Sequence, residues 1–383
     1  MRVAVITNFC PFYRVKLFRI LARELHATFF FFSDASEKNW EQLNPTGGDE
    51  LPAVHLRRGG AGTLRMLSRL FRALRRERYD AFIQGISGRF VVPVTFILAR
   101  WQRTPYIVWT GFWHHPQSLF HRLTFPLVRH IYRRADALIA YGTHVRAYLI
   151  SLGVDPQRIF IAWNTADNEL YNQPVSQAAL QALRTQLGIT DECIILFVGR
   201  LSEEKGVDVL INALALLRDD AALPRVRAVV CGRGPLADAL RAQCARLQLT
   251  NVTFLDYVPN DTLYVYYALA DVLVVPSVTT RVFKEPWGLI VNEAMNQGCV
   301  IIASDAVGAA RGGLLAHERN ALVVPERDPA ALAGALRRVL SSAALRAQLG
   351  QAARATIAHW TYERMAQAFI DAVAFSRRHH ETR

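Results

Sequence analysis

Short apolar runs alternate along this chain with longer segments whose apolar residues recur at helical spacing. The runs are rich in Val, Ile and Phe, as is typical of strands buried on both faces of a parallel sheet. This alternation is the βαβ pattern, which predicts parallel sheets covered by helices. Strands are predicted at 3–7, 28–32, 54–56, 81–84, 106–109, 137–140, 159–162, 194–198, 227–230, 252–255, 272–275, 300–303 and 321–323.

The predicted strands fall into two series, which indicates an α/β protein with two Rossmann-like domains. Residues 171–178 contain Pro174 and several small polar residues, and are the predicted linker. We therefore expect one domain over residues 1–170, a second over 171–360, and a final helix within 361–383. The longest apolar stretch, residues 90–101, is shorter than the ~18 residues of a membrane span. It is predicted to be a buried helix behind a strand.

The net charge of +13 is concentrated in the first half of the chain. Residues 1–170 hold 23 Lys and Arg against 12 Asp and Glu, and no acid lies between Asp80 and Asp136. Two segments, 64–78 and 119–134, place arginines beside apolar residues at helical spacing, and Arg57 and Arg58 precede the first. We expect the apolar stripes to face the sheet and the arginines to face an anionic membrane. A solvated face or another polyanion is the alternative, although no nucleic-acid recognition motif is present.

Candidate chemistry begins with Glu285 and Glu293, the first in a predicted loop and the second on the following helix. Paired carboxylates can accept charge-assisted hydrogen bonds from the vicinal hydroxyls of a sugar or a ribose. The alternative is a surface glutamate beside a solvated helical glutamate.

Two cations precede a predicted helix near Val207. Gly199 ends a strand, and Arg200 and Lys205 bracket the loop that follows. A helix N-terminus with two cations beside it suits a diphosphate. The alternative is that both cations pair with Glu203 and Glu204.

Five stretches, taken together and in this order, resemble the retaining glycosyltransferases of the GT-B fold, family 4. They are Ala135–Ala140, Asn164–Asp167, Phe197–Gly206, Val229–Pro235 and Glu285–Glu293. The resemblance spans nearly the whole chain. It implies the GT-B fold, with two Rossmann-like domains facing a central cleft, and a C-terminal helix that packs back on the first domain.

The resemblance also implies roles for individual residues. Arg200 and Lys205 would neutralise the departing nucleoside diphosphate, and Glu285 would contact the transferred sugar. The expected donor-binding residues are Gly199, Gly232, Gly234, Pro235, Tyr257, Val258, Gly288, Leu289 and Glu293, the last of these on the ribose. In the first domain the family's Gly-Gly loop is replaced by residues 8–14. Arg14, His114 and His115 are candidate acceptor or sugar contacts there, with ordinary structural roles left open.

The expected reaction moves a hexose, with retention, from a nucleotide-diphosphate sugar to a hydroxyl of a lipid-linked saccharide for a cell-surface polymer. No metal or further cofactor is expected, because Asp-x-Asp is absent from the sequence and two cations stand at the predicted diphosphate site. The five scattered cysteines favour the cytosol, at the inner face of the cytoplasmic membrane. The alternatives are a sugar-nucleotide epimerase of the same shape and a non-catalytic subunit that binds nucleotide or membrane.

Overall fold

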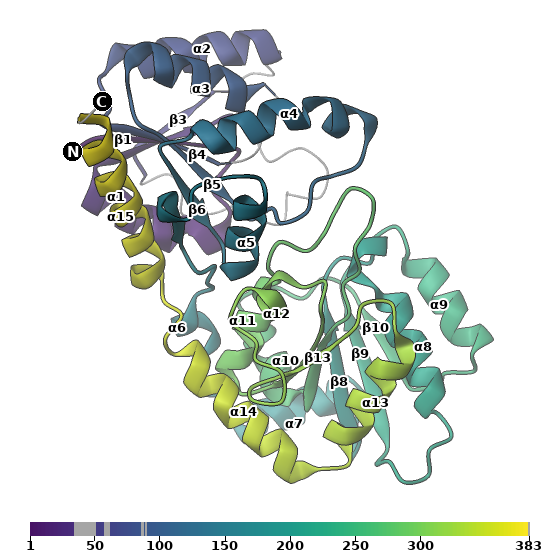
Figure 1. The fold of residues 1–383 in the computed structure, drawn as a ribbon. Coiled ribbons are helices and arrows are strands. Elements are labelled where there is room, and N and C mark those ends of the chain that lie inside the picture. Colours follow the sequence, from purple (N-terminus) through teal and green to yellow (C-terminus); the bar gives the residue numbers. More distant parts are fainter. Residues whose placement is uncertain (34–50, 57–61, 86–87, 89, 382–383) are drawn as a thin grey trace. The chain divides into compact units, whose positions relative to one another are not determined.

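The computed structural model describes residues 1–33, 51–56, 62–85, 88 and 90–381, which form two compact units. The first unit comprises Met1–Trp113, Leu119–Asn164 and Tyr362–Arg383, within the described ranges. The second comprises His114–Ser118 and Thr165–Thr361. Each unit is built on a parallel sheet with helices on its faces (Figure 1).

The first unit holds a seven-stranded sheet in the order β3-β2-β1-β4-β5-β6-β7. Its strands are β1 (Val3–Thr7), β2 (Ala27–Phe31), β3 (Ala53–His55), β4 (Ala81–Gly85), β5 (Tyr106–Thr110), β6 (Ala137–Ala140) and β7 (Ile159–Ile161). Every residue of β1, β4 and β5 is buried, because helices cover both faces of these strands. This explains why they read as continuous apolar runs rather than as alternating ones.

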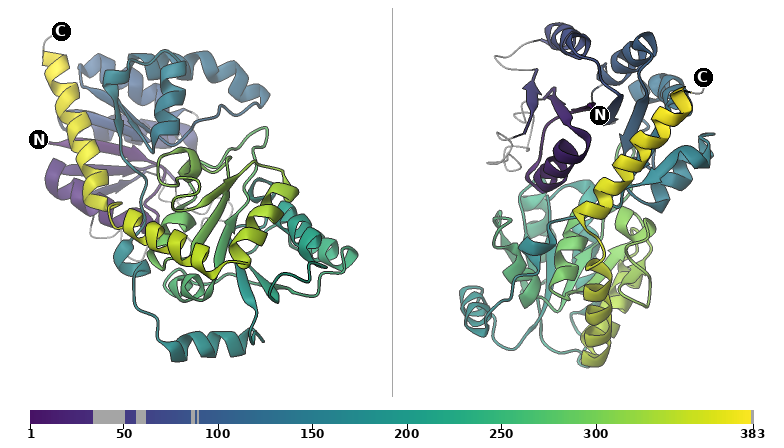
Figure 2. Two further views of the ribbon diagram at one scale, coloured as in Figure 1. Left: turned by 60° about the horizontal axis from the view of Figure 1, so that its bottom comes forward. Right: turned by 90° about the vertical axis from the view of Figure 1, so that its left-hand side faces the viewer.

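Helices cover the two faces of the first sheet in separate layers. On one face lie α2 (Thr63–Arg76), α3 (Val91–Gln102), α4 (Leu119–Arg134) and α5 (Thr143–Ser151). On the other face α1 (Val15–Leu25) packs beside α15 (Tyr362–Glu381), at the far end of the chain (Figure 2). The short 3-10 helices η1 (Phe12–Arg14) and η3 (Pro156–Arg158) complete the unit.

The second unit holds a six-stranded parallel sheet in the order β10-β9-β8-β11-β12-β13. Its strands are β8 (Cys193–Val198), β9 (Val226–Cys231), β10 (Val252–Leu255), β11 (Val272–Val275), β12 (Val300–Ser304) and β13 (Leu322–Val324). The chain builds outward from β8 in one direction and then, from β11, in the other. The strand order therefore reverses between β8 and β11.

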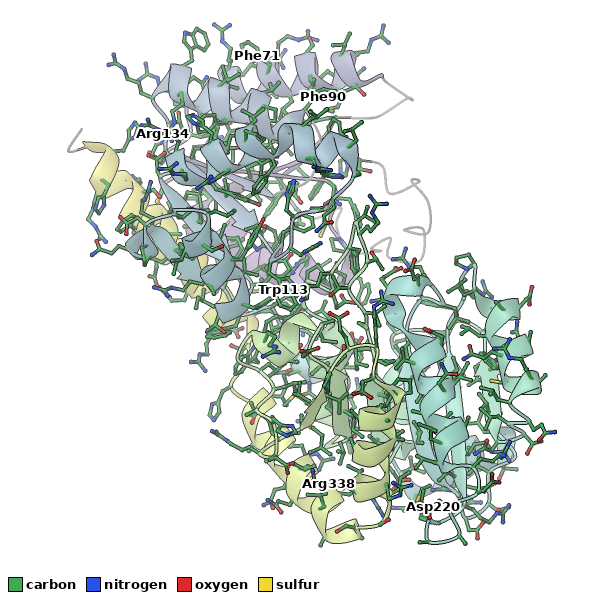
Figure 3. The ribbon with its side chains drawn as sticks, turned by 45° about the vertical axis from the view of Figure 1, so that its right-hand side comes forward. Phe71, Phe90, Trp113, Arg134, Asp220 and Arg338 are labelled. Atoms are coloured by element: carbon green, nitrogen blue, oxygen red, sulfur yellow. The ribbon has the colours of Figure 1, made fainter. Side chains whose placement is uncertain are left out.

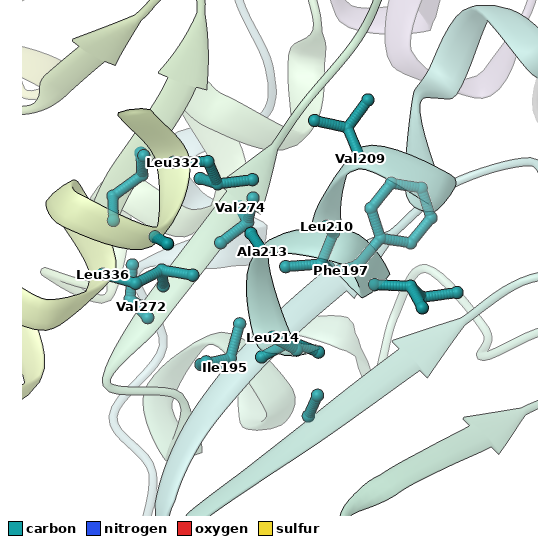
Figure 4. Close-up of a cluster of buried hydrophobic side chains, with 14 of the residues drawn as sticks. Ile195, Phe197, Val209, Leu210, Ala213, Leu214, Val272, Val274, Leu332 and Leu336 are labelled. Carbon is teal, nitrogen blue, oxygen red and sulfur yellow. The ribbon is translucent and has the colours of Figure 1, made fainter. Parts of the chain in front are cut away.

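The core of the second unit lies between its sheet and the helices α8 (Val207–Leu217), α9 (Ala237–Arg246) and α13 (Pro329–Leu340). Ile195 and Phe197 of β8 meet Leu210 of α8 there, and Leu336 of α13 closes the same cluster (Figure 4). The other helices are α6 (Asn168–Tyr171), α7 (Gln177–Gln186), η4 (Glu203–Lys205), α10 (Leu263–Leu269), α11 (Leu289–Asn296), α12 (Gly308–Arg311) and α14 (Ala343–Ile357).

All thirteen predicted strands are confirmed to within one residue at each end. The chain leaves the first unit at Asn164, whereas the expected boundary at residue 170 lies inside α6. The reason is that Asn168 of α6 donates hydrogen bonds to the carbonyls of Ile357 and Trp360, which belong to the second unit.

Two predictions about burial in the first unit are wrong in part. The helix over residues 90–101 is not fully buried, because Phe90, Ile97 and Trp101 are exposed. The apolar stripe of 119–134 is core only in part, since Tyr132 is buried whereas Leu123 and Leu127 are exposed. On α2 only Met66, Leu70 and Leu74 are buried. Arg57 and Arg58 lie outside the described residues.

Candidate functional site

The candidate site lies at the carboxyl edge of the second sheet, where the loops after β8, β9 and β11 meet. In open parallel sheets, ligands bind outside the carboxyl ends of the strands, at the point where the strand order reverses. Here that point lies between β8 and β11. Arg200 and Lys205 follow β8, and Glu285 follows β11.

The loops after β8 and β9 are joined through their backbones. The Gly199 N–H donates to the Cys231 carbonyl at 3.0 Å, and the Leu201 N–H donates to the Arg233 carbonyl at 2.8 Å. A Cβ atom on Gly232 would lie 1.9 Å from the Gly199 carbonyl oxygen. On Gly234 it would lie 2.2 Å from that of Leu201. The packing of the two loops alone therefore requires glycine at both positions, and an approach to a nucleotide would be an additional role.

Lys205 and Glu285 form an ion pair between the loops after β8 and β11. Lys205 ends the short helix η4, and its ammonium group reaches the Glu285 carboxylate. The Lys205 side chain is 23% exposed and that of Glu285 is 10% exposed, so the pair lies at the surface without being freely solvated. The Glu285 backbone carbonyl accepts from the Gly308 N–H at 3.1 Å, which holds this loop in place. Two residues expected at one site are thus in direct contact.

Arg200 has an acidic partner within its own loop. Its guanidinium donates to the Glu204 carboxylate at 2.9 Å, and the Ser202 hydroxyl donates to the same carboxylate at 2.7 Å. Desolvation acts against the charged form of Glu204, but the Ser202 hydrogen bond and the charges of Arg200 and Lys205 lower the pKa of its carboxyl. The alternative that paired the cations with nearby acids therefore describes Arg200 and not Lys205. The Arg200 side chain nevertheless stays 46% exposed.

Glu293 is buried within the second unit. It is the fifth residue of α11, one turn beyond the helix start where we expected it, and the Tyr267 hydroxyl of α10 donates to its carboxylate at 2.7 Å. Desolvation raises the pKa of Glu293 to about 7, although hydrogen bonds from Tyr267 and Tyr171 oppose the shift. The alternative of a solvated helical glutamate is therefore wrong.

A buried side-chain hydrogen bond stabilises the turn between Glu285 and Glu293. The Trp287 indole N–H donates to the Asn292 side-chain oxygen at 2.7 Å, and both side chains are buried. Gly288 has a φ of +89°, which permits the sharp entry into α11 at Leu289. Glycine at position 288 is thus required by the backbone, and the first free N–H groups of α11 follow it.

The remaining donor-site candidates lie on the loops after β9 and β10. Pro235 is exposed in the first of these loops, and Val258 is half-buried in the second. Tyr257 is 38% exposed, and its N–H donates to Asp256, which in turn is ion-paired with Arg233. Asp256 and Tyr267 were not among the predicted residues. A buried tyrosine hydroxyl on a neighbouring helix leaves no local signal in the sequence around Glu293.

The first-domain candidates fall in different units, Arg14 in the first and His114 and His115 in a segment grouped with the second. Arg14 is buried in the first unit, where its guanidinium donates to the Asn164 side chain and lies over the rings of Tyr13, Trp109 and Tyr141. It also contacts the Met365 sulfur at 3.4 Å, so it holds α15 against the sheet. To contact an acceptor, the Arg14 guanidinium would have to leave these partners.

His114 and His115 belong to the segment grouped with the second unit. The Gln117 N–H of that segment donates to the Arg281 carbonyl at 2.7 Å. Burial, Lys284 and His115 lower the pKa of His114. Across the described part of the chain, no three His, Cys, Asp or Glu side chains gather as a metal site would require.

Comparisons with known proteins cover both units. The family "Glycosyl transferase 4-like domain" matches residues 13–164, and the family "Glycosyl transferases group 1" matches residues 181–356. A D-inositol 3-phosphate glycosyltransferase of Corynebacterium glutamicum is 34% identical over 233 residues, which is 57% of this chain and 53% of the relative. The chain thus spans about half the length of the curated relatives it matches.

Solved structures match the fold over nearly the full length. Anabaena HepE in complex with UDP gives a TM-score of 0.79 at 21% identity and covers 98% of this chain and 100% of that one. WaaG, a glycosyltransferase involved in lipopolysaccharide biosynthesis, gives a TM-score of 0.69 at 18% identity. The match covers 97% of this chain and 99% of WaaG. At these identities the likeness concerns the fold.

Proposed function

Because this chain belongs to the group 1 glycosyltransferases of the GT-B fold, we propose that it transfers a sugar from a nucleotide-diphosphate sugar to a hydroxyl. The observation that carries the proposal is the ion pair of Lys205 with Glu285 at the point where the second sheet reverses its strand order. Structures of HepE in complex with UDP and with UDP-glucose support a nucleotide-sugar donor.

The proposed roles follow from charge and position. Lys205 and the half-exposed Arg200 would bind the diphosphate, whose negative charge grows as the glycosidic bond breaks. Fixed cations aimed at that charge stabilise the transition state. Glu285 would hold the sugar through its hydroxyls, and its pairing with Lys205 orients the carboxylate before the donor arrives. Glu293 would accept from the ribose.

We further propose retention without a metal ion. The acceptor hydroxyl would attack the anomeric carbon on the face that the diphosphate leaves, and the departing phosphate would take the hydroxyl proton. No protein nucleophile is then needed, and Lys205 and Arg200 supply the positive charge. The acceptor is proposed to be a lipid-linked saccharide of a cell-surface polymer, reached from the cytosolic side of the membrane. None of the described helices is both long and apolar enough to span a membrane.

The test is incubation of the purified chain with UDP-, GDP- and ADP-sugars, followed by chromatography of the products. Transfer to an added glycan, or slow hydrolysis of one donor, would support the proposal, whereas an isomerised donor would replace it with epimerisation. Lys205→Ala should lower turnover by roughly 10²–10³-fold, because it removes one preorganised charge from the leaving group. The melting temperature of the same variant is the control. An equal loss of stability and activity would make Lys205 a structural residue.

A further inference from the structure

The helical layer formed by α2, α3 and α4 leaves large apolar side chains uncovered. Eight of the fourteen exposed large apolar side chains in the described chain come from these helices or from Phe90 just before α3. The most exposed are Leu64 on α2 at 84%, Leu119 and Leu123 on α4 at 73% each, and Ile97 on α3 at 66%. A contiguous exposed apolar area on a folded unit marks a surface that another phase or molecule covers.

These helices lie side by side on one face of the first sheet. Their buried residues share a single core cluster, and ring contacts link the helices in order: Phe71 of α2 stacks on Trp101 of α3, and Phe96 of α3 meets His130 of α4. Phe71, Phe90 and Arg134 lie within this part of the first unit (Figure 3). The exposed apolar side chains therefore belong to one layer.

The charge of this layer has a single sign. The three helices contain ten arginines and no Asp or Glu. Arg72, Arg76, Arg122 and Arg129 are exposed among the apolar side chains. Surface arginines on a protein that only meets water are ordinarily balanced by nearby acids. Arg100 pairs with Asp136, which lies outside the three helices, but the helices themselves supply no acid for their other arginines. This excess of positive charge points to an anionic counterpart outside the chain.

Trp101 has the environment of an interfacial aromatic residue. Its side chain is exposed, its ring stacks on Phe71 at a centroid distance of 6.3 Å, and the Arg75 guanidinium lies 4.7 Å from the ring centroid. Tryptophan and arginine at the edge of an apolar surface are typical of proteins that lie in the headgroup region of a bilayer.

We propose that the α2–α4 face, represented by Leu64, Ile97, Trp101, Leu119, Leu123 and Leu127 with the arginines among them, docks on an anionic lipid bilayer. The arginines bind the headgroups, and the apolar side chains enter the boundary between headgroups and acyl chains. The inference rests on the proposed function to the extent that a lipid-linked acceptor gives the enzyme a reason to be there. An acidic protein partner is the competing occupant. The experiment below distinguishes the two by replacing the exposed apolar residues and by comparing vesicles with soluble polyglutamate.

Co-sedimentation with vesicles tests the proposal. The full chain should bind vesicles with equal shares of phosphatidylglycerol and phosphatidylcholine, and bind pure phosphatidylcholine far more weakly. Arg72→Gln with Arg76→Gln should lower the partition coefficient roughly 25-fold, at about fivefold per arginine. The matched control is Arg246→Gln with Arg319→Gln, two exposed arginines of the second unit.

The apolar arm separates bilayer insertion from attraction between charges alone. Leu123→Ser, Leu127→Ser and Ile97→Ser together should lower the partition coefficient more than tenfold, whereas Leu216→Ser, at a 57% exposed leucine of α8, should not. Brominated lipids should quench wild-type tryptophan fluorescence more than that of Trp101→Phe. The proposal is overturned if none of these substitutions lowers the partition coefficient, or if the chain binds soluble polyglutamate as tightly as it binds vesicles.

Donor hydrolysis without vesicles keeps this proposal separate from the proposed function. The face variants should hydrolyse a nucleotide sugar at the wild-type rate, since none of the substituted residues belongs to the second unit. A wild-type chain that sediments with anionic vesicles but neither binds nor hydrolyses any donor would refute glycosyl transfer and leave the docking face standing.

Discussion

Replacing Glu293 by glutamine separates the charge of this residue from its shape. The carboxyl is buried in the second unit and accepts from the Tyr267 hydroxyl. Glutamine fills nearly the same volume and keeps a side-chain oxygen for Tyr267, but it carries no charge at any pH. The variant therefore reports on the cost of holding a carboxylate at this position.

The magnitude follows from the shift of the Glu293 pKa, from 4.5 to about 7. A carboxyl whose pKa is higher in the folded state favours folding fully below pH 4.5 and loses that contribution as the pH rises toward 7. The free energy of unfolding should fall by about 3 kcal/mol across this interval and then level off. In Glu293→Gln the fall should be absent, so the variant should be the more stable protein at pH 8.

Urea unfolding between pH 4 and pH 8, followed by tryptophan fluorescence, measures this slope. Glu363→Gln, at an exposed glutamate of α15, is the control and should keep the wild-type slope. If the free energy of unfolding of Glu293→Gln depends on pH as that of the wild type does, burial does not raise the pKa of Glu293.

The same variant tests the ribose contact. Hydrogen bonds to a charged acceptor contribute about 1.5–3 kcal/mol, so titration calorimetry at pH 8 should find nucleoside diphosphate bound roughly tenfold to a hundredfold more weakly. Unchanged affinity in a variant that has gained stability would remove Glu293 from the donor site. Together, a gain in stability and a loss of affinity would identify a residue kept for binding at the expense of folding.

Three further predictions, one of them with a control substitution, test the site and the residues that support it. Glu285→Gln should lower kcat roughly tenfold to a hundredfold at unchanged affinity for the nucleoside diphosphate, as steady-state kinetics and calorimetry would show; weaker nucleotide binding would contradict its assignment to the sugar. Gly232→Ala should lower the free energy of unfolding in urea by about 2–5 kcal/mol, because its Cβ would meet the Gly199 carbonyl. As the control, Gly334→Ala lies in open space on α13 and should raise the free energy of unfolding by about 0.5–1 kcal/mol. Arg14→Ala should cost about 2–4 kcal/mol through lost packing and ring contacts, and unchanged stability would restore Arg14 as an acceptor contact.

Most strands could be predicted because they are short runs rich in β-branched and aromatic residues, and such runs are visible without knowledge of the partners. The central strands, such as β1, β5 and β11, are also buried along their whole length. The residues of the ion pair could likewise be found one by one from local motifs. Their pairing could not be predicted, because Lys205 and Glu285 are 80 residues apart and meet only through the order of β8 and β11.

Burial was the property that sequence patterns predicted least well. Apolar residues at helical spacing on 119–134 looked like a core stripe, but periodicity does not say which side of a helix the sheet covers, and Leu123 faces outward. Arg14 was predicted as a candidate acceptor contact, with a structural role left open. Its aromatic surroundings come from residues as distant as Trp109 and Tyr141, so nothing near it in the sequence indicates an enclosed guanidinium.

The return of α15 to the first unit affects how the protein can be synthesised. Phe369 and Met365 fill the same core cluster as Phe18 and Trp109, which come from the first third of the chain. While a ribosome is still translating the second unit, that side of the first sheet is covered by α1 but lacks α15, and the aromatic surface that α15 would cover is exposed. The half translated first is therefore the half completed last, and a recombinant fragment that stops at residue 164 should aggregate unless residues 362–383 are supplied with it.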